Sequence, residues 1–250
     1  MILDSGNSTS MTRKSEKSLA TAVLTGLLLV VSGTALGADR LLLATQLWPP
    51  YQTYDQGKMG GIAVERVQCA LQRMQQPYRF TMTRWDKAQL LVESNRMDGF
   101  FTGSNNASRN KYAVFSTPVI NEDLTWFMAP DVSIDPEDES AKYQARYGAK
   151  FNSSKWLYLK KNGYNVVKKP RDADVLLQML WQGELDVVLE YSGVFEHSIK
   201  KLGIPMDYFR RAHRSKKDLG VHFSRQFLKQ NPAFLNTFNS AMERCKKSSL

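Results

Sequence analysis

Short apolar runs that alternate with helical patterns constrain the fold of this chain more than any other feature. The first apolar run, 41–47, ends in a proline-rich turn at 48–51. A helical pattern then closes before Pro77, and two further strand patterns, 79–85 and 98–103, enclose a second helical pattern. Strands that alternate with helices in this way predict a parallel sheet covered by helices on both faces.

The second half of the chain repeats this order. Helical patterns at 153–162 and after Asp172 alternate with short strand patterns, the last of them at 185–189. Residues 95–101 and 183–189 echo each other, because each segment ends a helix, offers a carboxylate at the turn and begins a buried strand. We therefore expect two similar α/β lobes rather than a single sheet.

The N-terminal segment has the pattern of a secretory signal peptide. Basic residues precede an uncharged run, 18–38, and the small residues Ala35 and Gly37 suit a cleavage site. We expect residues 1–37 to be removed and the mature protein to reach the periplasm. The alternative is an uncleaved anchor, because the uncharged run is just long enough to span a bilayer.

Charge and motif spacing exclude several classes of function. The chain carries a net charge of +10, but its basic residues form no long block and no zinc-finger spacing. The three histidines and two cysteines lack the close spacing of a metal site. Glycine-rich phosphate loops and the Gly-x-Ser-x-Gly nucleophile turn are also missing from the sequence. We therefore expect no nucleic acid, no metal and no cofactor.

The two cysteines allow one disulfide. In an oxidising compartment Cys69 and Cys245 can pair if the fold brings them together. The alternative is two buried free thiols that pack as small apolar side chains.

Polar and aromatic residues gather where the predicted strands end, which is where open parallel sheets bind ligands. These residues are Trp48, Tyr51, Thr102, Ser104, Arg109 and Glu190. Arginine can grip a carboxylate with two parallel hydrogen bonds, and hydroxyl groups can complete that site. Glu190 could balance an ammonium group, while Trp48 could cover an apolar or cationic side chain. The set predicts a site for a small zwitterion.

Each of these residues also has a purely structural interpretation. Trp48, beside two prolines, could be a core residue, and Arg109 could be a solvated surface charge. Glu190 could form a local cap or salt bridge. The basic cluster at 200–217 is expected to be a solvated face of the protein.

A series of short motifs follows one order along the mature chain. They are Trp48-Pro49-Pro50-Tyr51, 61–65, Trp85, Asp98-Gly99, Thr102-Gly103-Ser104, Ser108-Arg109, 113–118 and 185–190. In this order and spacing, residues 39–247 resemble the solute-binding proteins of polar-amino-acid ABC importers, solute-binding family 3.

The resemblance implies the type II periplasmic-binding-protein fold. Two α/β lobes, each a mostly parallel sheet flanked by helices, would be joined by two hinge crossings with the ligand in the cleft. Lobe 1 would comprise 38–126 and 219–250, and lobe 2 would comprise 127–218. The return of the C-terminal segment to lobe 1 would bring Cys245 toward Cys69.

The resemblance also implies roles for the site residues. An arginine at the position of Arg109 holds the α-carboxylate, residues matching Thr102 and Ser104 assist, and an aromatic matching Trp48 stacks on the ligand. A residue that opens a second-lobe helix, here Ser153 or Ser154, contributes as well. Two positions depart from the pattern, because Ala63 replaces an acidic residue and Glu190 replaces the aspartate that takes the α-amino group.

The sequence thus predicts a periplasmic solute-binding protein rather than an enzyme. We expect a monomer that closes on an amino-acid-like ligand by hinge bending and delivers it to an ABC permease. One alternative is a periplasmic dehydratase of the cyclohexadienyl or arogenate type, with Glu190 as the proton donor. Another is a sensory module that acts through a second protein.

Overall fold

The computed structural model describes residues 40–247, which belong to one compact unit, Ala38–Leu250. The predicted signal peptide, 1–37, lies outside the described residues. A mixed sheet runs through this unit in the order β4-β1-β5-β10-β6-β9-β7-β8. Its strands are β1 (Leu41–Thr45), β4 (Tyr78–Met82), β5 (Gly99–Ser104), β6 (Ala113–Met128), β7 (Tyr147–Gly148), β8 (Val166–Lys168), β9 (Val187–Tyr191) and β10 (Arg210–Ser224). A separate hairpin pairs β2 (Thr53–Asp55) with β3 (Lys58–Gly60).

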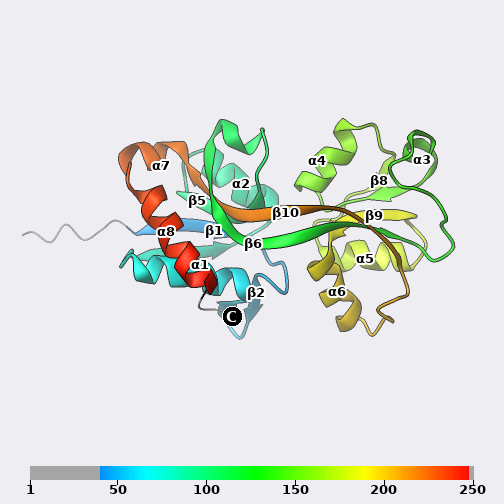
Figure 1. Cartoon of the computed structure of the whole chain (residues 1–250), viewed down its shortest axis with the longest axis horizontal. Helices are drawn as coiled ribbons and strands as arrows, with labels where there is room; N and C mark the ends of the chain where they lie inside the picture. The colour runs from blue at the N-terminus through cyan, green and yellow to red at the C-terminus, as the bar shows by residue number, and fades with distance from the viewer. Residues whose placement is uncertain (1–39, 248–250) are drawn as a thin grey trace, which may run out of the picture. The chain divides into compact units, whose positions relative to one another are not determined.

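At one end of the sheet, β4, β1 and β5 are parallel, and we call this part with its helices the first lobe (Figure 1). Its helices are α1 (Ile62–Arg73), α2 (Trp85–Glu93), α7 (Arg225–Gln230) and α8 (Phe234–Lys247). Val64, Val67 and Leu71 recur at helical spacing in α1 and are fully buried. They share an apolar core with Phe238 and Met242 of α8. The first lobe is therefore completed by the C-terminal helix.

At the other end, β9, β7 and β8 are parallel and form the second lobe with its own helices. These are α3 (Glu139–Gln144), α4 (Ser154–Lys161), α5 (Ala173–Trp181) and α6 (Ser192–Lys201). Side-chain caps fix where two of them begin. Ser153 Oγ accepts the N–H of Trp156 at 3.1 Å, and Asp172 accepts the N–H groups of Asp174 and Val175. The cap at Ser153 fixes the beginning of α4, the helix that faces the first lobe.

The carboxylates of the repeated segment have the same role in both lobes. Asp98 accepts the backbone N–H of Leu42 in β1 at 2.8 Å. Asp186 accepts the backbone N–H of Arg146, just before β7, at 2.7 Å. Each carboxylate thus ties the beginning of its own strand, β5 or β9, to the beginning of the neighbouring parallel strand.

Two long antiparallel strands, β6 and β10, connect the lobes. In the first lobe β10 pairs with β5 at 219–223, and in the second lobe β6 pairs with β9 at 124–128. Because β6 and β10 also pair with each other, both lobe sheets belong to one continuous ladder, which differs from the separate sheets expected above. The predicted α/β class with two crossings is confirmed, whereas the boundaries proposed for the lobes stay a prediction.

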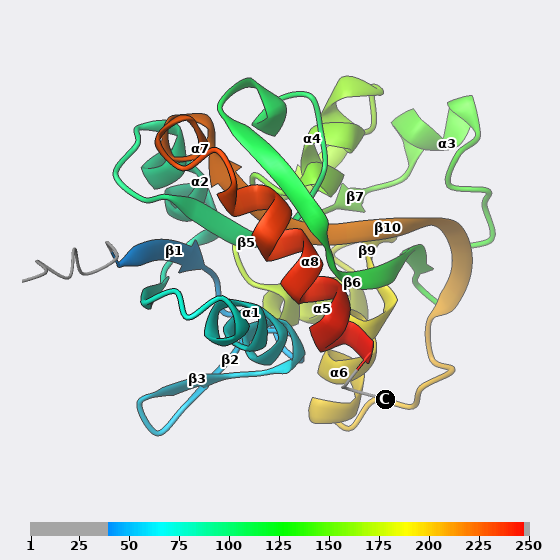
Figure 2. The ribbon, with the colours of Figure 1, turned by 60° about the vertical axis from the view of Figure 1, so that its left-hand side comes forward.

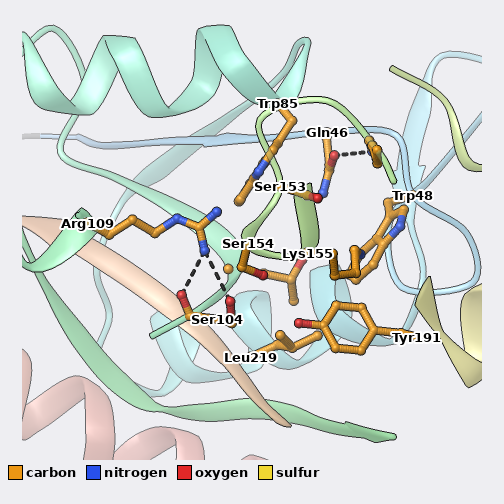
Figure 3. Close-up of a pocket in the computed structure, with 13 residues that line it drawn as sticks. Gln46, Trp48, Trp85, Ser104, Arg109, Ser153, Ser154, Lys155, Tyr191 and Leu219 are labelled. Carbon is orange, nitrogen blue, oxygen red and sulfur yellow. Dashed lines mark hydrogen bonds between the residues drawn. The ribbon is translucent and has the colours of Figure 1, made fainter. Parts of the chain in front are cut away.

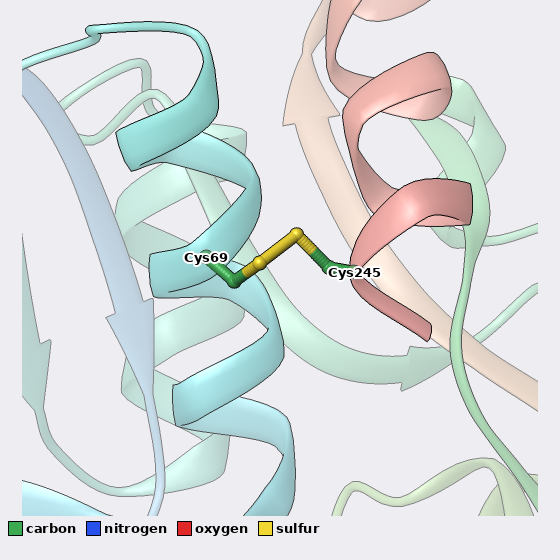
Figure 4. Close-up of a disulfide and its surroundings, with 2 residues drawn as sticks. All are labelled: Cys69 and Cys245. Atoms are coloured by element: carbon green, nitrogen blue, oxygen red, sulfur yellow. A yellow bond between two sulfur atoms is a disulfide. The ribbon is translucent and has the colours of Figure 1, made fainter. Parts of the chain in front are cut away.

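A disulfide joins Cys69 of α1 to Cys245 of α8, as Figure 4 shows, with 6.0 Å between the two Cα atoms. Figure 2 shows the two helices side by side on the first lobe. The bridge closes a loop of 176 residues in sequence. Since long loops lose much chain entropy when they are cross-linked, the bridge restricts the unfolded state strongly.

We expect the double variant Cys69→Ser/Cys245→Ser to lose about 2–4 kcal/mol of unfolding free energy, because its unfolded chain is unconstrained. Urea titration followed by circular dichroism measures the change. Reduction with dithiothreitol should lower the midpoint of the wild type and leave the double variant unaffected. Equal midpoints for the oxidised wild type and the variant would contradict this prediction.

Candidate functional site

A small cavity lies between the two lobes and encloses about 20 Å³, which is room for about one water molecule. Figure 3 shows the residues that surround it. They are Gln46, Trp48, Trp85, Thr102, Gly103, Ser104, Arg109, Lys150, Ser153, Ser154, Lys155, Tyr191 and Leu219. Six of the eight predicted ligand-binding residues are among them, and Tyr51 and Glu190 are not.

The carboxyl ends of parallel strands place most of these side chains. Gln46 and Trp48 follow β1, 102–104 end β5, and Tyr191 ends β9. The second lobe adds the first turn of α4, with Ser153 at the N-cap. This is the place where parallel sheets hold ligands, and here two such edges face the same cavity.

Arg109 is buried at the first-lobe side of the cavity, with 2% of its surface exposed. Its guanidinium donates to the backbone oxygen of Ser104 at 2.7 Å and to Gln89 Oε1 at 3.0 Å. The guanidinium carbon lies 5.1 Å from the centre of the Trp85 ring. Burial lowers the pKa of Arg109 to about 10, so that the side chain stays charged at neutral pH.

Two buried lysines face Arg109 from the second lobe. Lys150 Nζ donates to Gln46 Oε1 of the first lobe, and burial lowers the pKa of Lys150 to about 8. Lys155 Nζ donates to Glu190 Oε1 and lies 4.2 Å from the centre of the Tyr191 ring. Burial lowers the pKa of Lys155, although its ion pair with Glu190 opposes that shift.

Glu190 is placed differently from the prediction. The strand β9 continues to Tyr191, so Glu190 lies within the strand and its side chain is 0% exposed. Its Oε1 atom accepts from Lys155 Nζ and from the N–H of Tyr191 at 2.8 Å. The carboxylate expected to meet a ligand ammonium is therefore already paired with a side chain of the protein.

Tyr51 also lies outside the cavity lining. Its hydroxyl donates to Glu122 Oε1 in β6, and its ring centre lies 5.6 Å from that of Trp48. The other carboxylate oxygen of Glu122 accepts the N–H of Gly193 in α6 at 3.2 Å. Burial raises the pKa of Glu122 to about 7. Tyr51 thus supports Trp48 and joins the first lobe to the crossing strand and, through it, to the second lobe.

Two polar atoms of the lining are buried without a hydrogen-bond partner. They are the indole nitrogen of Trp48 and the hydroxyl oxygen of Thr102. Native proteins satisfy most such groups, so these two are suited to a donor or acceptor that a bound molecule supplies.

Sequence reasoning missed seven lining residues: Gln46, Trp85, Gly103, Lys150, Lys155, Tyr191 and Leu219. The rule that ligands lie at strand ends could have found several of them, because Gln46 follows β1, Lys150 follows β7 and Tyr191 ends β9. Lys155 gave no comparable signal, since its burial depends on how α4 packs against β9.

Within residues 40–247, no group of three or more His, Cys, Asp or Glu side chains is arranged to hold a metal ion. Over the same part of the chain, no helix has the length and apolar character needed to cross a membrane.

The sequence profile of one protein family, the bacterial extracellular solute-binding proteins of family 3, matches residues 41–250. The chain belongs to this family. A search of curated proteins finds no match to this family 3 protein.

Solved structures of the periplasmic-binding-protein fold also align with this chain. A histidine kinase sensor domain with similarity to periplasmic binding proteins aligns with a TM-score of 0.73 at 17% identity, over 85% of this chain and 92% of the other. The arginine-, lysine- and histidine-binding protein ArtJ from Geobacillus stearothermophilus aligns with a TM-score of 0.70 at 15% identity, over 84% and 90%. A mutant of ArgBP from T. maritima gives a TM-score of 0.68 at 18% identity, over 84% and 90%. The family 3 protein therefore has the periplasmic-binding-protein fold.

A buried histidine, His222, lies behind Arg109 in this family 3 protein. It is 0% exposed, and its ring stacks on Phe100 with 4.7 Å between centres. Neither ring nitrogen has a hydrogen-bond partner among the described residues. Burial, together with the positive charge of Arg109, lowers the pKa of His222 well below 6.5. A neutral histidine is therefore stacked on Phe100 behind Arg109.

We expect the unfolding free energy to fall as the pH drops below about 6.5, by at most about 1.4 kcal/mol per pH unit from this residue. The reason is that His222 takes up a proton in the unfolded chain but not in the folded protein. Urea titrations between pH 5 and 8 should give a shallower acid slope for His222→Leu than for the wild type. Parallel profiles would show that another group causes the acid sensitivity.

Proposed function

We propose that this family 3 protein is a periplasmic solute-binding protein that captures a small carboxylate-bearing ligand between its two lobes. The observation that carries the proposal is the position of Arg109. Its buried guanidinium, with Thr102 and Ser104 beside it, faces Ser153 and Ser154 of the second lobe across one cavity. A guanidinium with hydroxyl groups on either side is suited to a carboxylate.

Closure of the lobes would enclose the ligand. Several polar contacts join the lobes. They include Lys150 Nζ to Gln46 Oε1, Gln89 Nε2 to Asn152 O at 3.3 Å, and Arg171 to Asp86 at 3.5 Å. A cavity of about 20 Å³ cannot admit an amino-acid-sized molecule while these contacts hold, so entry requires the lobes to part. A ligand that touches both lobes then favours the closed form over the open one.

The family and its neighbours support a ligand of amino-acid size. Two of the neighbours are named for arginine or for arginine, lysine and histidine. We propose export through the signal peptide predicted at 1–37 and delivery of the ligand to an ABC permease. The alternative is a sensory role, which the likeness to a histidine kinase sensor domain favours. Crosslinking to membrane partners with and without ligand would separate the two, since one role requires a permease and the other a signalling protein.

Binding is favoured over catalysis by the position of Glu190. A dehydratase of the type considered above needs a carboxylic acid that reaches the substrate. Glu190 is instead buried behind the lining and paired with Lys155.

We expect the purified protein to respond to at least one compound in a panel of the twenty amino acids, their deaminated analogues and short dicarboxylates. Binding at a hundred times the dissociation constant stabilises the folded state by about 2.7 kcal/mol, which raises the melting temperature. Small-angle X-ray scattering should show a smaller radius of gyration with the same compound. A panel that produces neither response would contradict the proposal.

We expect Arg109→Lys to weaken binding of that compound at least tenfold, because a lysine cannot form two parallel hydrogen bonds to a carboxylate. Isothermal titration calorimetry measures the change. Arg79→Lys, at an exposed arginine of β4, is the matched control and should keep the wild-type affinity. Equal affinities of the two variants would show that Arg109 does not bind the ligand.

A further inference from the structure

We propose that the ligand is a short dicarboxylate without a free α-ammonium group, a proposal that rests on the solute-binding function of the same cavity. The reason is that Lys155 of the protein occupies the place where an α-ammonium group would bind. The cavity therefore offers two separate positive centres and no negative one.

Three buried cations line the cavity, and among the described residues no Asp or Glu does. Arg109, Lys150 and Lys155 have exposed fractions of 2%, 4% and 3%. Burying a cation without a negative partner is unfavourable, so a cavity of this composition selects anions.

Lys155 fills the cation site of the second lobe. Its ammonium group donates to Glu190 and lies 4.2 Å from the ring centre of Tyr191 and 5.2 Å from that of Trp48. A carboxylate acceptor together with two nearby aromatic rings is an arrangement that binds ammonium groups. A ligand ammonium that approached this place would meet the like charge of Lys155 instead.

Lys155 and Glu190 neutralise each other, which leaves two cations without a carboxylate. Neither Arg109 nor Lys150 forms an ion pair with any side chain in residues 40–247, and their hydrogen-bond acceptors are neutral. The unpaired charges of Arg109 and Lys150 favour a ligand with two negative charges. The lowered pKa of Lys150 is consistent with this, because an anion beside it would raise that pKa again and so stabilise the charged form.

The two cations lie against different rings. The Arg109 guanidinium is 5.1 Å from the centre of Trp85, and Lys150 Nζ is 6.0 Å from the centre of Trp48. Figure 3 shows Arg109 entering from one side of the cavity, with Trp48, Tyr191 and Lys155 together on the other side. Two separated centres fit two carboxylates at the ends of a short carbon chain better than the single centre of a phosphate.

An adjoining cavity of about 120 Å³ adds room for a ligand. It shares Ser104, Ser154, Lys155 and Tyr191 with the first cavity and is also lined by Arg214 and Lys217. Because Arg214 forms an ion pair with Glu137 at 2.8 Å, the positive charge that this cavity adds comes from Lys217.

Titration calorimetry with matched pairs tests the proposal on the purified protein. Succinate is compared with L-aspartate and glutarate with L-glutamate, because the members of each pair differ only by the α-ammonium group. Inorganic phosphate is the third arm. We expect at least one dicarboxylate to bind ten times more tightly than its amino acid and than phosphate.

Three results would overturn the proposal, and they are distinguishable. If the amino acid of each pair binds as tightly as its dicarboxylate or more tightly, the ligand class is wrong and the solute-binding function stands. If only phosphate binds, the anion site is right and the dicarboxylate is wrong. If nothing in the panel of the preceding section binds, the proposed function fails as well.

A variant of Lys155 tests the reason for the preference. Lys155→Met removes the ammonium group and opens Glu190 to the ligand, so the preference should reverse by at least tenfold toward the amino acid of the pair. Lys161→Met, at an exposed lysine of the same helix, is the control and should keep the wild-type preference.

If Lys155→Met does not fold with its unpaired carboxylate, the double variant Lys155→Met/Glu190→Gln carries the test, because it leaves no buried charge at this place. We expect its dicarboxylate and amino-acid affinities to differ by less than threefold. A double variant that keeps the wild-type preference would show that Lys155 does not determine it.

Discussion

The pairing of β6 with β10 is the constraint on which the rest of the structure depends. These strands are the only elements among the described residues that take part in the sheets of both lobes. Apart from Leu219, which lies on β10, the lining residues belong to one lobe or the other, so the twist and bending of the two strands govern the distance between Arg109 and the second-lobe lysines. Glu122 lies on β6 at this junction and contacts both Tyr51 and Gly193. The candidate site is therefore shaped by the strands that join the lobes and not by either lobe alone.

The buried Lys155–Glu190 pair is better understood as a means of selection than as a source of stability. Removing two charges from water usually offsets the attraction between them, so such pairs contribute little net free energy to folding. In this protein the pair has another effect, because Lys155 places an ammonium group of the protein itself beside Glu190 and near the rings of Tyr191 and Trp48. The proposed dicarboxylate would complement the two remaining cations, Arg109 and Lys150, and would not compete with the ammonium group of Lys155.

The spacing of apolar and polar residues along the chain was sufficient to predict much of the fold and part of the candidate site. Strand and helix periodicities gave the parallel units, and residues beyond strand ends, such as Trp48 and Thr102, could be named because the sheet edge follows from the strand direction. Arg109 came from the same reasoning. Lys150, which follows the short strand β7, lay within reach of the same rule. Lys155 could not be named, because the chain has many lysines and only the packing of α4 determines which of them become buried. Glu190 was assigned to a ligand because its internal partner, 35 residues away, is invisible in a linear pattern.

The return of the chain to its first lobe has a consequence for how that lobe is held together. The first lobe lacks β10 and α8 until the last part of the chain is available, whereas all the strands and helices of the second lobe lie between β6 and β10. The helix α8 therefore closes the apolar core of the first lobe and supplies Cys245 for the disulfide with α1, so elements from both ends of the fold hold this lobe together.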